Sequence, residues 1–253
     1  MSATLGDRKT GDDAGSLGPR HPFIGSWHYR VLKRLAMELL RLLYRLRIEG
    51  AQRFPPAGAA VLVSNHPSYL DPGILYAALP REVRYMAWDR LFQNPRFEAF
   101  CRLFGAFPVN PAWGSPSAVK AARQVLEGGD VLGIFPEGGR TKGESLDPFR
   151  RGAFNLAIQF QVPIVPVSLS GTRWIWPIGR RFPRLSGRIR IVVHPPILPP
   201  HGDGEGAEGR LLEQTRAAVE SGLEPGFRLQ PSGFRKGREE APGSGVTVQK
   251  AKG

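Results

Sequence analysis

A histidine and an aspartate five positions apart follow the first strongly apolar run of this chain. The run AAVLV (59–63) leads directly into SNHPSYLD (64–71), which contains His66 and Asp71. A tight turn can bring the Asp71 carboxylate to one ring nitrogen of His66, where it fixes the tautomer and stabilises the imidazolium. Such a pair can act as general base on a hydroxyl that the substrate supplies. The same spacing in isolation also fits a His–Asp pair that only closes a turn.

A second polar loop follows another apolar strand. The segment VLGIF (131–135) continues into PEGGRT (136–141), which combines an acid, two glycines and an arginine. Gly138 and Gly139 let backbone N–H groups approach a ligand closely. Arg140 offers a planar fork for phosphate or carboxylate. Glu137 can accept hydrogen bonds from substrate hydroxyls, or it can fold inward and brace the loop.

The elements around these loops alternate between strand and helix. Apolar runs predict strands at 59–65, 83–88, 131–135, 162–170 and 188–193. Helices are expected at 72–79, 92–104, 115–127, 153–160 and 206–221. This alternation predicts an α/β fold with a mostly parallel sheet flanked by helices. In such sheets chemistry lies at the carboxyl ends of the strands, where both polar loops are placed.

The segment 22–48 is predicted to contain an amphipathic helix over Trp27–Ile48. Its polar stripe carries Arg30, Arg34, Glu38, Arg41 and Arg45, and leucines occupy the opposite side. A basic amphipathic helix is typical of a segment that lies in a membrane interface. The alternative is a surface helix that packs its leucines on the domain core.

Composition restricts the partners and the compartment. The formal net charge of +13, from 35 Lys and Arg against 22 Asp and Glu, indicates an anionic partner. No helix-turn-helix, zinc-finger or aromatic RNA-binding signature is visible, so we expect no nucleic acid. Cys101 is the only cysteine, which excludes an intrachain disulfide and favours a reducing compartment. The sequence suggests neither a signal peptide nor a metal-ligand cluster.

Three segments of the chain carry a family resemblance. NHPSYLD (65–71) resembles the NHxxxxD motif of the lysophosphatidic acid acyltransferase family of glycerolipid acyltransferases. FPEGGRT (135–141) resembles that family's FPEGTRS motif, and VPIVPV (162–167) is similar to the proline-containing strand that follows it. The resemblance covers roughly residues 48–196.

The resemblance implies a function for each motif. His66 and Asp71 would be the catalytic pair. The substrate-binding positions would be Asn65, Glu137, Gly138, Gly139, Arg140 and Thr141. Acyl-CoA or acyl-carrier protein would be the donor, and a lysophospholipid, with 1-acyl-glycerol-3-phosphate as the first candidate, the acceptor. No cofactor is implied. The helix at 27–48 becomes a contact to anionic lipid, and we expect a peripheral protein at the cytoplasmic face of the inner membrane.

One stretch departs from the family pattern. Asn110-Pro111 stands where the family usually has an aspartate and an arginine that helps to hold the acceptor phosphate. Lys120 and Arg123, on the next predicted helix, are the candidates to replace that charge in phosphate binding; the alternative is an acceptor other than a simple glycerol phosphate.

The predicted organisation is a disordered leader at 1–21, the interface helix within 22–48, the acyltransferase domain at 49–225 and a disordered basic tail at 226–253. Two other functions stay open from the sequence. The net charge also fits a nucleic-acid-binding module, and Pro111 fits a membrane-binding protein that has kept the fold without activity.

Overall fold

Seven strands form one sheet in the computed structural model, which describes residues 27–109, 115–141, 145–200 and 206–224. Across the sheet their order is β1-β7-β6-β2-β5-β3-β4. They comprise β1 (Arg47–Glu49), β2 (Ala60–Ser64), β3 (Val83–Trp88), β4 (Ala106–Val109), β5 (Val131–Ile134), β6 (Ile164–Ser170) and β7 (Arg190–Val193). The strand that leads into His66, β2, is therefore the central one, with β5 and β6 on either side.

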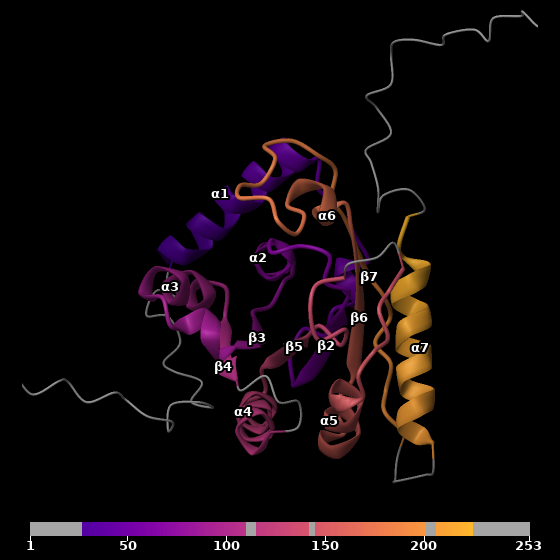
Figure 1. Cartoon of the computed structure of the whole chain (residues 1–253). Helices are drawn as coiled ribbons and strands as arrows, with labels where there is room; N and C mark the ends of the chain where they lie inside the picture. The colour runs from indigo at the N-terminus through magenta and orange to yellow at the C-terminus, as the bar shows by residue number, and fades with distance from the viewer. Residues whose placement is uncertain (1–26, 110–114, 142–144, 201–205, 225–253) are drawn as a thin grey trace, which may run out of the picture.

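The strands from β6 to β4 run parallel, so the predicted mostly parallel sheet is confirmed. The exceptions are β7, which is antiparallel to β6, and the edge strand β1, which is parallel to β7 and so also runs against the other five. After β6 the chain stays at the carboxyl edge of the sheet, where α6 (Thr172–Ile175) and residues 176–189 lie at the top of Figure 1. The next strand starts from that edge and must run back.

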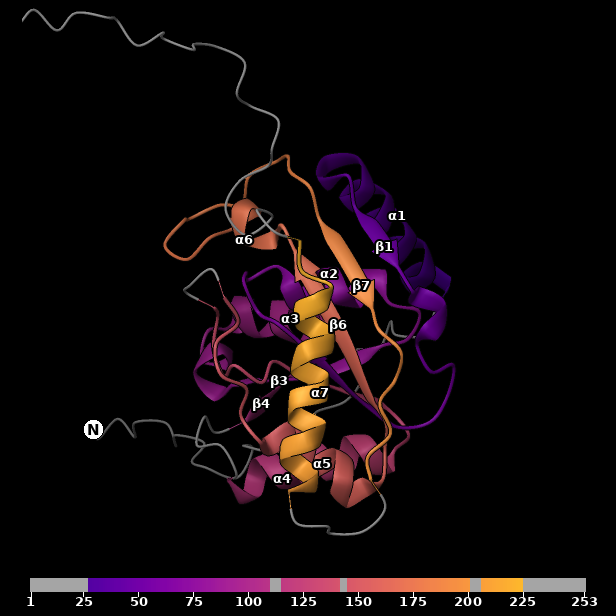
Figure 2. The same cartoon turned by 90° about the vertical axis from the view of Figure 1, so that its right-hand side faces the viewer.

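Helices cover both faces of the sheet (Figures 1 and 2). One face carries α1 (Trp27–Tyr44), α2 (Asp71–Ala78) and α3 (Pro95–Leu103), and the other carries α4 (Pro116–Glu127), α5 (Gly152–Phe160) and α7 (Ala207–Ser221). Side chains alternate along a strand. In β2, Leu62 therefore joins the core under α2, whereas Val61 and Val63 join the core under α4 and α5.

The structure corrects several predicted boundaries. The first helix ends at Tyr44, not Ile48, because Arg45 adopts a left-handed backbone conformation with φ of 44°. Residues 47–49 instead form the edge strand β1, so the domain boundary predicted at residue 49 falls within the sheet. The helix predicted at 92–104 begins only at Pro95, after the short 3-10 helix η2 (Asp89–Phe92). A second 3-10 helix, η1 (Ala51–Arg53), follows β1.

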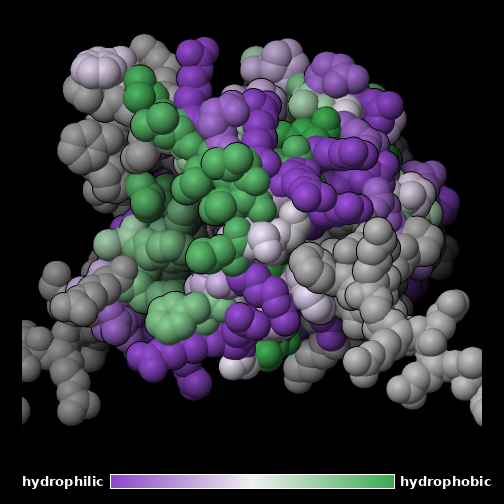
Figure 3. Space-filling view, turned by 90° about the horizontal axis from the view of Figure 1, so that it is seen from above, coloured by the Kyte–Doolittle hydropathy of each residue, from purple (hydrophilic) through white to green (hydrophobic). Residues whose placement is uncertain are grey.

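The two faces of α1 differ from the single leucine side that the sequence predicts. Met37, Leu40 and Leu43 pack against the core on the α2 side of the sheet. A separate row of apolar side chains points into solvent and comprises Trp27, Val31, Leu35, Leu39 and Leu42. Viewed from above in Figure 3, hydrophobic residues gather on the side of the molecule along which α1 runs, next to strongly hydrophilic ones. Thus α1 both packs on the core and exposes leucines.

Among the described helices, none has the length and apolar character needed to cross a membrane. The leader predicted at 1–21 and the tail predicted at 226–253 lie outside the described residues, as do Asn110 and Pro111.

Candidate active site

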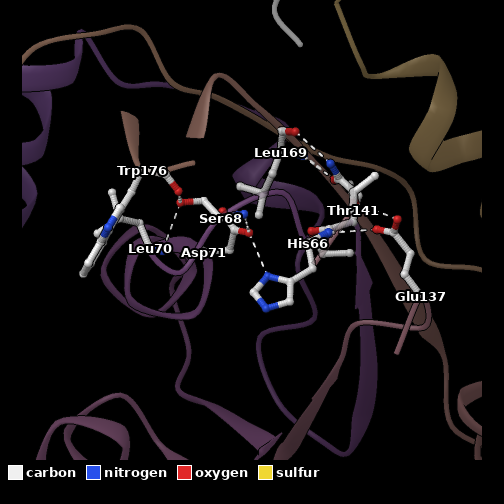
Figure 4. A network of polar contacts seen from close by, with 10 residues as sticks. His66, Ser68, Leu70, Asp71, Glu137, Thr141, Leu169 and Trp176 are labelled. Carbon is white, nitrogen blue, oxygen red and sulfur yellow. Dashed lines mark hydrogen bonds and ion pairs between the residues drawn. The ribbon is translucent and has the colours of Figure 1, made fainter. Parts of the chain in front are cut away.

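His66 and Asp71 meet at the carboxyl end of the central strand. β2 ends at Ser64, and the next residues turn so that Asp71 opens α2. His66 Nδ1 lies 2.8 Å from Asp71 Oδ2. Figure 4 shows the two side chains pointing toward one another. The Ser68 N–H also donates to Asp71 Oδ2, over 2.7 Å. The Asp71 carboxylate is fully buried, so it is held in one place beside the imidazole.

The plane of the His66 ring is fixed by an aromatic stack. Phe135, which directly follows β5, stacks on His66 with ring centroids 4.1 Å apart. Tyr85 from β3 in turn stacks on Phe135 at 5.7 Å. Because Nδ1 faces Asp71, the second ring nitrogen, Nε2, is left to accept a proton, and it has no hydrogen-bond partner in the described part of the chain. The His66 side chain keeps 18% of its surface exposed, which leaves a route to a substrate.

Two buried oxygen atoms near the pair have no hydrogen-bond partner within the described ranges. One is Asp71 Oδ1, and the other is the hydroxyl oxygen of Tyr85. Burial, and then the charge of Asp71, raises the pKa of Tyr85 well above its usual value. The Tyr85 hydroxyl therefore keeps its proton.

Glu137 joins the two motif loops. One carboxylate oxygen accepts from the His66 N–H over 2.9 Å. The other accepts from the Thr141 hydroxyl over 2.7 Å and from the Asp147 N–H over 3.0 Å. The Thr141 N–H returns a bond to the His66 carbonyl over 2.9 Å. Burial raises the pKa of Glu137, while these three donors act in the opposite direction. Of the two roles that the sequence leaves open for Glu137, the geometry is that of the brace.

Asn65 is likewise occupied by the protein. Its side-chain amide donates to the Leu169 carbonyl over 2.9 Å, and its oxygen accepts from the Leu169 N–H over 2.8 Å. This pair of bonds ties the end of β2 to β6. Asn65 is buried, and both polar groups of its side chain bond to Leu169, so it braces the turn that carries His66.

Arg140 lies over the face of Tyr69, with its guanidinium carbon 3.5 Å from the ring centroid. Tyr69 also contacts Trp176 in a tilted arrangement, with centroids 5.6 Å apart. Arg140 Nη1 is buried and has no hydrogen-bond partner among the residues that the structure describes. A buried guanidinium N–H without an acceptor is costly, and an anionic ligand oxygen would supply one.

The two loop glycines differ in their surroundings. Gly138 has φ of 75°, and a Cβ there would come within 2.5 Å of the Arg150 Nε. Only glycine fits this position without displacing the Arg150 side chain. Gly139 is exposed, with open space where a side chain would be.

Lys120 and Arg123 are not brought to this cluster. Both lie on α4, which covers the face of the sheet opposite α2. Arg123 lies 3.7 Å from a carboxylate oxygen of Glu127 and over the ring of Phe160 at the end of α5. Both side chains are exposed on that layer, so they are separated by the sheet from the α2 side on which the His66 ring stacks.

Sequence reasoning missed several side chains that shape the site. The Tyr69 ring stacks against the Arg140 guanidinium, and the Phe135 ring stacks on His66. The Ser68 hydroxyl donates to the Trp176 carbonyl over 3.1 Å and accepts from the Leu70 N–H. Ser68 and Tyr69 lie inside the first motif, and Phe135 begins the second. Their position within the motifs was the sequence signal that could have marked them as parts of the site.

The arrangement is suited to proton transfer from a substrate hydroxyl. Asp71 is placed to orient the imidazole and to stabilise its charged form, and Nε2 is the ring nitrogen that could take a proton. Across the described ranges, no cluster of three or more His, Cys, Asp or Glu could hold a metal ion.

Comparison with known proteins places the same segments in one family. The model of the acyltransferase family matches residues 45–170, which contain both motif loops. The chain is 30% identical over 179 residues to the chloroplastic 1-acyl-sn-glycerol-3-phosphate acyltransferase LPAT1 of Arabidopsis thaliana. It is 36% identical over 170 residues to the 1-acyl-sn-glycerol-3-phosphate acyltransferase alpha of Ovis aries.

The matches cover 70% and 65% of this chain but only 50% and 58% of those two relatives. The chain thus spans about half the length of the relatives it matches. Among solved structures, it resembles the 1-acyl-sn-glycerophosphate acyltransferase PlsC of Thermotoga maritima with a TM-score of 0.63 at 22% identity, over 76% of this chain and 78% of that one. That likeness supports the fold. From the family model together with these relatives, the chain belongs to the acyltransferase family.

Proposed function

We propose that this protein transfers a fatty-acyl group from a thioester to the free hydroxyl of a lysophospholipid, with 1-acyl-sn-glycerol-3-phosphate as the acceptor, in phospholipid synthesis. The observation that carries the proposal is the 2.8 Å contact between His66 Nδ1 and the buried Asp71 carboxylate at the end of β2. The relatives named as 1-acyl-sn-glycerol-3-phosphate acyltransferases support the choice of acceptor.

In the proposed reaction, His66 Nε2 removes the proton of the acceptor hydroxyl as its oxygen attacks the thioester carbonyl carbon. The Asp71 carboxylate stabilises the imidazolium that forms. The tetrahedral intermediate collapses with cleavage of the carbon–sulfur bond. The thiolate then takes the proton from His66, so the histidine returns to its starting state and the products are an ester and a free thiol.

Arg140 is the proposed contact to the acceptor phosphate. It is a cation next to the catalytic loop, and its Nη1 lacks a partner among the described residues. The Tyr69 ring beneath the guanidinium limits its motion. Glu137, Asn65 and Thr141 act in this proposal by holding the loops together. Acyl-CoA and acyl-carrier protein both offer the required thioester.

The proposed place of the reaction is the surface of an anionic membrane, at the cytoplasmic face of the inner membrane. The exposed apolar row of α1, defined by Trp27, Val31, Leu35, Leu39 and Leu42, would enter the interface. The exposed Arg34, Arg41 and Arg45 on the same segment would meet lipid phosphates. Since both substrates contain acyl chains, this position would give the site direct access to them.

The test is acyl transfer by the purified protein. Acyl-CoA or acyl-carrier protein would be mixed with a panel of lysolipids, and thiol release and the acylated product would be measured together. We expect the largest kcat/KM with 1-acyl-glycerol-3-phosphate. Preference for another lysolipid would overturn the acceptor assignment, and absence of transfer from either donor to every acceptor would overturn the enzymatic function.

A further inference from the structure

A loop rich in arginine connects α6 to β7 and lies at the carboxyl edge of the sheet, at the top of Figure 1. We call residues 176–189 the arginine-rich loop. It contains Arg180, Arg181, Arg184 and Arg188. Its apolar side chains are unusually exposed for their size: Phe182 keeps 66% of its surface accessible and Leu185 keeps 75%, and Ile178 is exposed too.

Internal contacts give this loop a defined shape. The Trp176 indole N–H donates to the Arg180 carbonyl over 2.8 Å, and Arg180 Nε donates to the Phe182 carbonyl over 2.9 Å. The Arg184 guanidinium stacks on Trp174 at 3.9 Å and also donates to the Trp174 carbonyl. The exposed Phe182 and Leu185 are therefore presented by a structured loop.

The loop is joined to the C-terminal end of α1. The Tyr44 hydroxyl donates to the Arg184 carbonyl over 3.0 Å. The Gly187 N–H donates to the Leu43 carbonyl over 3.3 Å, and the Ile189 N–H to the Tyr44 carbonyl over 2.9 Å. The exposed apolar row of α1 and the arginine-rich loop thus belong to neighbouring parts of one surface.

The start of the loop also reaches the catalytic pair. The Trp176 carbonyl accepts from the Ser68 hydroxyl, and Ser68 donates its N–H to Asp71. The Trp176 ring contacts Tyr69, which lies under Arg140. The loop that exposes Phe182 and Leu185 therefore begins at a residue, Trp176, that contacts the candidate site.

We propose that the arginine-rich loop is a second membrane contact, which inserts Phe182 and Leu185 into an anionic phospholipid bilayer beside α1. This inference rests on the proposed function, because it assumes a lipid substrate that is collected at a membrane. The combination of exposed apolar side chains with flanking arginines matches an interface with anionic headgroups above hydrocarbon. Two contacts, by the loop and by α1, would hold the protein on the bilayer in one orientation, with the carboxyl edge of the sheet near the lipid.

The first experiment measures co-sedimentation of the full chain with vesicles of phosphatidylcholine, alone or mixed with phosphatidylglycerol. Phe182→Ser combined with Leu185→Ser should weaken binding about tenfold or more, through loss of buried apolar area. Leu198→Ser is the matched control, since Leu198 is also 75% exposed. It adjoins Ile197, which pairs with Ile164 at the start of β6, the opposite edge of the sheet, so its loss should leave binding unchanged.

The charge contribution has its own matched pair. Arg181→Gln should weaken binding to the anionic vesicles roughly fivefold and have little effect at high salt. Arg210→Gln removes the same charge near the start of α7 and should have no such effect. Equal effects of the two arginine changes would show that overall charge, not this loop, attracts the membrane, and would overturn the proposal.

A probe on the native-length loop keeps the proposal testable if the double variant folds poorly. Phe182→Cys can be labelled with an environment-sensitive dye, because Cys101 is buried and burial raises the pKa of its thiol. We expect a blue shift of emission on adding anionic vesicles. The second contact would be overturned if the labelled Phe182→Cys protein bound vesicles without a shift and only the Leu35→Ser/Leu39→Ser variant lost vesicle binding. The proposed function would still stand in that case. If the unmutated protein failed to acylate a dispersed short-chain acceptor, which requires no membrane, the result would instead count against the proposed function itself.

Discussion

Tyr69 supports the guanidinium of Arg140, and removing its ring should weaken acceptor binding. The two groups are in face contact, with 3.5 Å between the guanidinium carbon and the ring centroid. A cation–π contact is worth roughly 0.5–1 kcal/mol when exposed and about 2 kcal/mol when desolvated. Tyr69 is 42% exposed, which places the contact near the lower range, at about 1 kcal/mol. Such a loss corresponds to a factor of about five in an equilibrium constant.

We therefore expect Tyr69→Leu to raise the KM for 1-acyl-glycerol-3-phosphate about fivefold. The kcat and the KM for the donor should change little. Tyr69→Phe keeps the ring face and is the matched control, with an unchanged acceptor KM. The assay is the initial rate of thiol release with acceptor varied at saturating donor. An Arg140→Ala background should remove the effect of Tyr69→Leu, because the two side chains act together.

Two results would refute this reasoning. An equal rise in KM for Tyr69→Phe would assign the effect to the hydroxyl and not to the ring face. A fall in kcat alone would place Tyr69 in the positioning of His66, since both residues lie in the same loop.

Three further changes have defined expectations. Asp71→Asn should lower kcat by favouring the wrong His66 tautomer, roughly 10²–10⁴-fold and by no more than loss of His66 itself, as measured by thiol release; an unchanged rate would remove Asp71 from the mechanism. Burial lowers the pKa of His194, because the folded protein disfavours the charged imidazole. The stability contributed by neutral His194 is therefore fully present above about pH 6.5 and is lost as the pH falls through the lowered pKa. Thermal melts of His194→Gln should accordingly depend less on pH below that value than those of the unmutated chain. Replacing the exposed Leu35 and Leu39 by serine should weaken vesicle binding even at high salt without lowering the melting temperature, whereas a lower melting temperature would assign them to the core.

The sheet and the contact between the two catalytic candidates could be predicted because their signals are local. His66 and Asp71 lie in one short segment that directly follows an apolar strand, and the two side chains are found in contact. The strands β2 and β5 are continuous apolar runs bounded by polar loops, which is typical of buried parallel strands. Local patterns of this kind need no knowledge of the rest of the chain.

The features that were missed depend on contacts between distant segments. The strand β1 has only three residues, and it forms by pairing with β7 at Arg190–Val192, far along the chain. From the sequence alone, the helical pattern of the preceding residues was therefore continued through positions 47 and 48. The direction of the Glu137 side chain depends on the His66 N–H, which belongs to another loop. The Tyr69–Arg140 contact also joins the two motifs across the site. For side chains in different loops, sequence spacing indicates which are available but not which of them meet.

The most direct test of the proposed chemistry is the rate of acyl transfer by His66→Ala, measured as thiol release together with formation of the acylated phospholipid. A melting temperature close to that of the unmutated chain would establish that the variant is folded. We expect the rate to fall roughly 10²–10⁴-fold, because the described site places no other group to take the hydroxyl proton. A folded His66→Ala protein that transfers acyl groups at the full rate would contradict the proposed role of this histidine.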